Sequence, residues 1–167
     1  MGANFKFVNA GYPIHAPVEA ATTLVAKHGI ALDAIEAIHI GMPTNAMKVV
    51  DGRDMHNICV QDMVTAALIQ GGLKLRELPF PAMLSNPAFP SLRPRVTAAG
   101  DAELDRDQPT GRGAIVRIQL KDGTTVVQRV EHPRGHSLRG GVTWDELAVK
   151  WKEGLPECDI DRMLALT

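Results

Sequence analysis

The chain has 167 residues, 45% hydrophobic and 22% charged, which suits one ordinary domain that needs no disulfide or structural metal. Its net charge of −1 and its few aromatic residues argue against a nucleic-acid binder, which needs a basic surplus. Charges or prolines interrupt every apolar run, so neither a membrane span nor a signal peptide is predicted. Cys59 and Cys158 fit no zinc spacing; free thiols in a cytoplasmic protein are expected, with one disulfide as the alternative.

Two helices and a strand are predicted in the first 72 residues. Pro17 at the start and Gly29 just past the end punctuate the first helix, whose apolar residues share one face. Alternation of apolar residues over 35–42 predicts a half-buried strand that ends at Pro43. The next helix, at about 57–70, is apolar on most sides and should therefore be central.

A proline-rich connector separates these elements from the predicted sheet strands. Five prolines lie between residues 78 and 94, which excludes a long helix and predicts short turns packed on the surface. A strand near 95–98 should follow. Segments 112–120 and 124–130 alternate on either side of Asp122-Gly123, which predicts a β-hairpin because the tight turn needs positive φ. The buried face of its first strand is expected to carry Val116, Ile118 and Leu120.

The C-terminal part begins with a capping box. Thr143 is followed three residues later by Glu146, which predicts a helix that starts at residue 144. Leu147 and Trp151 should face inward, and Asp159 is expected to cap a last short helix.

The order of these elements predicts one α+β domain over residues 1–167. Its small antiparallel sheet should pack against helices in two layers. Residues 5–12 show no helical period and contain Asn9-Ala10-Gly11, so we expect an exposed, mobile loop there.

Four blocks of the sequence stand in a distinctive order. They are Lys6 to Ala20, with a lysine, a loop, a histidine and an Ala-rich helix; the strand 35–43; Asn57-Ile58-Cys59-Val60-Gln61-Asp62 with the rest of its helix; and the hairpin followed by Glu131-His132-Pro133-Arg134-Gly135 and Trp144-Asp145-Glu146-Leu147. Together they resemble the C-terminal α+β domain of the MmgE/PrpD family, the relatives of 2-methylcitrate dehydratase and cis-aconitate decarboxylase. The resemblance covers nearly the whole chain.

The resemblance implies a lyase that needs no cofactor or metal. Such enzymes remove or add water, or decarboxylate, on small polycarboxylates, by taking a proton next to a carboxylate that cationic groups hold. It also implies a helical N-terminal domain, in cis or in trans, which is not part of these 167 residues and supplies important His and Asp residues to a shared active site. We therefore expect part of an enzyme, inactive alone. The alternatives are a stand-alone carboxylate-binding or regulatory module and a homodimerisation module.

Five residues are candidates for the site. The resemblance places a substrate-facing lysine at Lys6 and the family's active-site tyrosine at Asp62, and both are assigned to catalysis. His15, at a helix start, and Arg134 and His136, in a loop with glycines, are assigned to substrate binding, because an imidazole or a guanidinium there can hold a carboxylate. The structural alternatives are a solvated lysine, a packing or capping histidine, and a cationic turn.

His56, Cys59 and Asp62 recur every three residues at the start of the central helix. Such a mixed triplet is a poor zinc signature, so no metal site is predicted. Cys59 is expected in the core, His56 as a cap and Asp62 beside a cleft. A buried unpaired carboxylate costs free energy, so Asp62 should be paired, at an edge, or functional. Gly11 departs from the family pattern, since many members carry His or Cys there.

Overall fold

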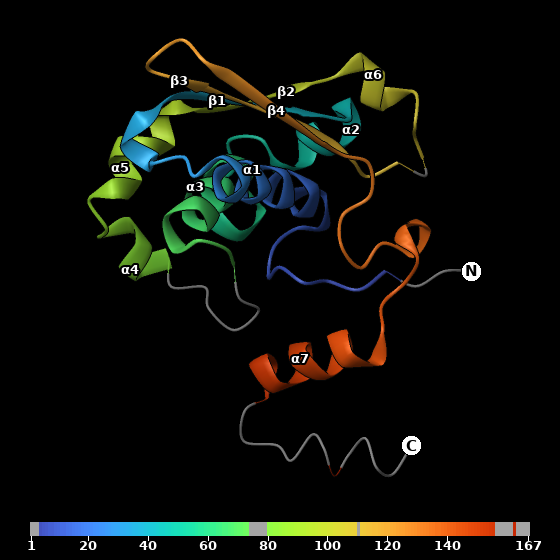
Figure 1. Ribbon diagram of the computed structural model, residues 1–167. Helices are drawn as coiled ribbons and strands as arrows, with labels where there is room; N and C mark the ends of the chain where they lie inside the picture. The colour runs from blue at the N-terminus through green and yellow to red at the C-terminus, as the bar shows by residue number, and fades with distance from the viewer. Residues whose placement is uncertain (1–3, 74–79, 110, 156–161, 163–167) are drawn as a thin grey trace.

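The computed structural model describes residues 4–73, 80–109, 111–155 and 162. Within these ranges, a four-stranded sheet forms one layer, and α1 and α3 pack against one of its faces (Figure 1). This confirms the predicted α+β class. The helices and strands, in chain order, are α1 (His15–His28), β1 (Ile35–Met42), α2 (Thr44–Val50), α3 (Val60–Gln70), α4 (Phe80–Leu84), α5 (Ala88–Leu92), β2 (Val96–Gly100), α6 (Ala102–Asp105), β3 (Ala114–Leu120), β4 (Thr125–Val130) and α7 (Trp144–Gly154).

The sheet is mixed, with the strand order β2-β1-β3-β4. β3 and β4 pair antiparallel around Gly123, whose φ of 88° confirms the predicted hairpin turn. β1 also pairs antiparallel with β3. The prediction of a wholly antiparallel sheet is wrong, because β2 runs parallel to β1 with Val96 opposite Ile38. The chain between these two strands passes through α2, α3, α4 and α5, and a crossover of that length returns it to the same end of the sheet.

The core lies between the sheet and α1 and α3. Ile38 and Ile40 of β1, with Val116 and Ile118 of β3, are buried on the helix-covered face. α3 is buried along almost its whole length, which confirms its predicted central position. α1 begins at His15, earlier than predicted, because a proline is tolerated within the first helical turn, where its missing N–H has no helical partner.

The proline-rich connector forms two short helices, α4 and α5, instead of simple turns. Its prolines do keep both helices short, at five residues each. The predicted surface location is wrong, since apolar side chains from both helices enter the hydrophobic core. These are Phe80, Met83, Phe89 and Leu92.

The N-terminal segment is irregular, as predicted, yet it is packed against the domain. The Phe5 amide donates a hydrogen bond to the Gly135 carbonyl at 2.8 Å, and the Gly11 amide donates to the Asn57 carbonyl at 2.9 Å. Ala10 is buried. The expectation of an exposed loop therefore holds at Lys6 and Asn9 and fails for the rest of the segment, which bridges the loop after β4 and the turn before α3.

α7 lies farthest from the sheet in Figure 1. Its capping box is formed in both directions between Thr143 and Glu146, as predicted. Leu147 is buried, Trp151 is half-buried, and Trp144 is 65% exposed. The predicted cap at Asp159 and the second cysteine, Cys158, lie outside the described residues.

Candidate functional site

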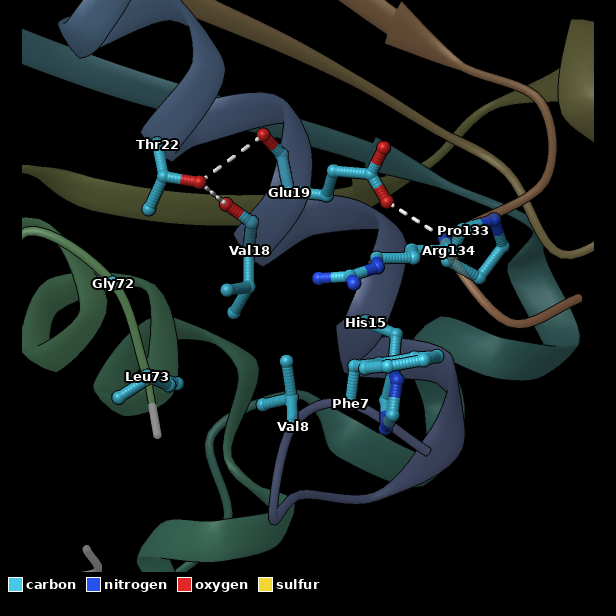
Figure 2. A pocket seen from close by; sticks show the side chains of 10 residues that line it. All are labelled: Phe7, Val8, His15, Val18, Glu19, Thr22, Gly72, Leu73, Pro133 and Arg134. Atoms are coloured by element: carbon cyan, nitrogen blue, oxygen red, sulfur yellow. Dashed lines mark hydrogen bonds between the residues drawn. The ribbon is translucent and has the colours of Figure 1, made fainter. Parts of the chain in front are cut away.

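A pocket of about 280 Å³ opens between the N-terminal segment, α1 and the loop after β4 (Figure 2). Its wall combines apolar side chains with an imidazole, a carboxylate and a guanidinium. The lining residues are Phe7, Val8, His15, Val18, Glu19, Thr22, Gly72, Leu73, Pro133 and Arg134. The pocket therefore brings together two of the three predicted substrate-binding residues.

His15 is the buried polar group of this pocket. Its side chain is 2% exposed, and its Nε2 has no hydrogen-bond partner among the described residues. Burial, assisted by the positive charge of Lys6, lowers the pKa of His15 to about 4. The Ala10 carbonyl opposes this lowering of the pKa, and because Nε2 is unpaired, we assign that carbonyl to the Nδ1 side of the ring. The neutral ring thus keeps its proton on Nδ1 and offers the lone pair of Nε2 as an acceptor.

Arg134 forms the cationic edge of the pocket. Its guanidinium lies 4.2 Å from the centroid of the Phe7 ring, and its Nε donates to Glu146 Oε1 at 3.1 Å. The Arg134 amide donates to Glu19 Oε2 at 2.8 Å. These contacts tie the loop after β4 to α1, to the N-terminal segment and to α7, so the guanidinium has a defined position beside the pocket.

Lys6 and His136 lie near the pocket without lining it. Lys6 Nζ donates to the Ala10 carbonyl at 3.2 Å. His136 is 4% exposed and stacks on His132, with 4.5 Å between the ring centroids. Burial lowers the pKa of His136, and the nearby His132 and Arg112 lower it further. Its Nδ1 accepts a hydrogen bond from the Leu138 amide at 3.1 Å, so this nitrogen stabilises the loop.

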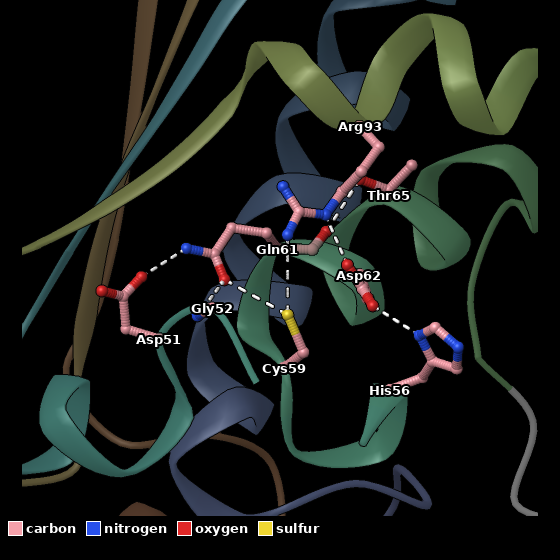
Figure 3. Close-up of polar contacts among 8 residues, drawn as sticks. All are labelled: Asp51, Gly52, His56, Cys59, Gln61, Asp62, Thr65 and Arg93. Atoms are coloured by element: carbon pink, nitrogen blue, oxygen red, sulfur yellow. Dashed lines mark hydrogen bonds and ion pairs between the residues drawn. The ribbon is translucent and has the colours of Figure 1, made fainter. Parts of the chain in front are cut away.

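Asp62 belongs to a different cluster, at the start of α3 (Figure 3). One carboxylate oxygen accepts from Arg93 Nε, and the other lies 2.6 Å from His56 Nδ1. Burial alone would raise the pKa of Asp62, but the hydrogen bonds from Arg93 and His56 outweigh it and lower that pKa. Cys59 is in the core, as predicted. The prediction that His56 caps a helix is wrong, since its ring binds Asp62 instead.

Sequence reasoning missed three residues that organise these two places. The Glu19 carboxylate accepts hydrogen bonds from the Arg134 amide and from Arg139 Nη1. These bonds join α1 to a loop more than 100 residues later in the chain. Arg93 neutralises Asp62 from the end of α5, and Tyr12 lies 5.0 Å from His15 between ring centroids. The one available signal was Asp62 itself, because a carboxylate on an apolar helix is expected to be paired, at an edge, or functional.

Among the described residues, no group of three or more His, Cys, Asp or Glu side chains is arranged to hold a metal ion. None of the helices in the described ranges is both long and apolar enough to cross a lipid bilayer.

The comparison with protein families matches the MmgE/PrpD C-terminal domain over residues 9–158. The matched range contains His15, Asp62, Arg134 and His136, whereas Lys6 lies just before it. The comparison with curated proteins finds no match.

Proposed function

Since this chain belongs to the MmgE/PrpD family as its C-terminal domain, we propose that it is part of a cofactor-independent lyase for small polycarboxylates. The resemblance implies that a helical domain, in cis or in trans, completes the active site. In this proposal the present chain contributes the pocket at His15 and Arg134, and it does not turn over substrate alone.

The observation that carries the proposal is the unpaired Nε2 of His15 beside a cavity. A buried polar atom without a partner costs roughly 1–3 kcal/mol. A ligand that enters the cavity and supplies the missing hydrogen bond recovers this cost. Because Nε2 is an acceptor, the group that it prefers is a donor, and the donor on a hydroxy acid is its hydroxyl.

Arg134 supports the acidic part of the proposed ligand. A guanidinium binds a carboxylate through parallel N–H donors and keeps its charge at every physiological pH. Its stacking on Phe7 and its bond to Glu146 restrict its rotamers before a ligand arrives. The side chain remains about half exposed, which leaves it accessible to an incoming acid.

Lys6 and Asp62 are proposed as the contribution of this chain to catalysis, Lys6 through its charge and Asp62 through the side chains that its carboxylate holds. Lys6 adds a second positive charge close enough to His15 to affect its protonation. Such a charge stabilises the negative charge that develops when a proton next to a carboxylate is removed. Asp62 remains ionised at neutral pH, because Arg93 and His56 bind both of its oxygens.

The proposed ligand class is tested by comparing citrate with tricarballylate, the same tricarboxylate without the hydroxyl group. We expect calorimetry to show weak binding of citrate that falls as salt rises, because an exposed guanidinium is screened. Tricarballylate should bind roughly 2- to 10-fold more weakly, which corresponds to one net hydrogen bond.

His15→Phe should remove the difference between the two acids, and Arg134→Gln should weaken both. Arg117→Gln is the matched control, because Arg117 lies exposed on β3 and does not line the pocket. If neither acid binds at millimolar concentration, the domain is a structural module and the proposal is wrong.

A further inference from the structure

The Asp62 cluster contains an imidazole held by a carboxylate. His56 Nδ1 lies 2.6 Å from Asp62 Oδ2, and Arg93 occupies the other oxygen of the same carboxylate (Figure 3). We infer that His56 is a further catalytic residue of the lyase proposed above, with its Nε2 as the atom that accepts the proton and Asp62 as its positioning residue. This inference rests on that proposed function.

Asp62 is suited to orient a ring and unsuited to act as the base itself. Its side chain is 10% exposed, and both carboxylate oxygens already accept hydrogen bonds. The salt bridge with Arg93 compensates the cost of burying the negative charge, so the carboxylate stays ionised. An ionised carboxylate can only accept hydrogen bonds, and the proton in the short contact therefore belongs to His56 Nδ1.

This hydrogen bond determines what the rest of the ring can do. With the proton on Nδ1, a neutral imidazole carries its lone pair on Nε2. The carboxylate also fixes the orientation of the ring, as in other carboxylate–histidine pairs. Figure 3 shows Nε2 directed away from Asp62. The His56 side chain is 35% exposed, so an acid can reach it.

One contact holds the His56 ring, and another holds the turn that carries it. Phe80 stacks on His56 with 4.7 Å between centroids and an interplanar angle of 11°. The next residue, Asn57, accepts a backbone hydrogen bond from Gly11 at 2.9 Å. That bond connects the His56 turn to the N-terminal segment, which lines the proposed substrate pocket with Phe7 and Val8. The turn that carries His56 is thus bonded to the segment that forms one wall of the pocket.

In a dehydration, Nε2 takes the proton from the carbon next to a carboxylate. The electron pair of that C–H bond becomes the new double bond, and hydroxide leaves the neighbouring carbon. The imidazolium proton combines with the hydroxide, so that water departs and His56 returns to its neutral form. Addition of water follows the same steps in reverse.

The inference is tested on the 167-residue chain without substrate. Two-bond ¹⁵N–¹H spectra should show His56 with its proton on Nδ1 and a bare Nε2. Ethoxycarbonylation by diethyl pyrocarbonate, followed by peptide mass spectrometry, should modify His56 faster than His39. His39 is an internal reference, because its Nδ1 lies 2.8 Å from the Thr97 hydroxyl instead of a carboxylate.

Asp62→Asn should lower the rate at His56 by about tenfold, since the amide can donate to Nδ1 and move the ring proton to Nε2. Asp105→Asn is the matched control, because the Asp105 carboxylate accepts hydrogen bonds from Thr44 and not from His56. If His56 in the wild-type chain carries its proton on Nε2, or reacts no faster than His39, the inference is wrong. Citrate binding at His15 is measured separately, so a failure of the proposed function is distinguishable from a failure here.

Discussion

Acidification should destabilise the domain through His15. The ring is buried and neutral in the folded chain, and its pKa is lowered from the ordinary 6.5 to about 4, first by burial and then by Lys6. Between these two values the unfolded chain binds more protons than the folded chain, so stability is lost as the pH falls. This contribution is complete above about pH 6.5 and decreases down to about pH 4.

The expected size follows from the width of this window. Each unit of pKa difference corresponds to about 1.4 kcal/mol, so the free energy of unfolding should fall by about 2–3 kcal/mol between pH 7.5 and pH 4.5 because of His15 alone. His136, whose pKa is also lowered, adds a loss of the same sign. The effect of His15 must therefore be read as a difference between wild type and a variant.

The assay is urea unfolding of the wild-type chain and of His15→Phe at both pH values. The aromatic replacement is similar in size and does not titrate, so its pH dependence should be smaller by about 2–3 kcal/mol. His28→Phe, at the solvent-exposed end of the same helix, should retain the pH dependence of the wild type. Equal losses in wild type and His15→Phe would refute the assignment of a buried neutral imidazole.

Three other variants test the architecture. Gly123→Val should destabilise the chain by roughly 1–3 kcal/mol in urea unfolding, because φ is 88° in the hairpin turn; an unchanged midpoint would oppose this register. Gly135→Ala should lower the free energy of unfolding more than Gly140→Ala does. A Cβ at position 135 would lie 2.3 Å from the Phe5 carbonyl oxygen, whereas no atom lies within 4 Å of a Cβ at position 140. Limited proteolysis should then cut the N-terminal segment of Gly135→Ala faster. Thr143→Ala should lower the helicity of α7, measured by circular dichroism, because it removes about 1 kcal/mol of capping.

Local sequence signals predicted the parts of the fold whose cause is local. The Asp122-Gly123 turn and the Thr143–Glu146 capping box depend on a few neighbouring residues, and both form as predicted. The parallel pairing of β1 with β2 depends on the path of the chain through the four helices α2 to α5, which no short pattern encodes. The buried position of Phe80 and Phe89 has the same origin, since it depends on a core surface built by distant segments.

The candidate site divides in the same way. His15 was predicted at the start of a helix beside a loop, and it lies there. That His15 shares a pocket with Arg134 could not be predicted, because the loop of Arg134 is bonded to Glu19, 115 positions away, only in the folded chain. The sequence predicted that Asp62 is paired, at an edge, or functional. It did not show that Arg93 and His56 would both be its partners.

The central claim is that this domain supplies only part of a lyase site. It is tested most directly by following the ultraviolet absorbance of double-bond formation or loss with the purified 167-residue chain and methylcitrate, citrate or cis-aconitate. A half-site open to water lacks the positioning and the enclosed environment that lower the barrier, so we predict that the folded chain shows no turnover. Robust turnover by this chain alone, abolished by Lys6→Ala or Asp62→Ala, would show that it is a complete enzyme and would contradict the account.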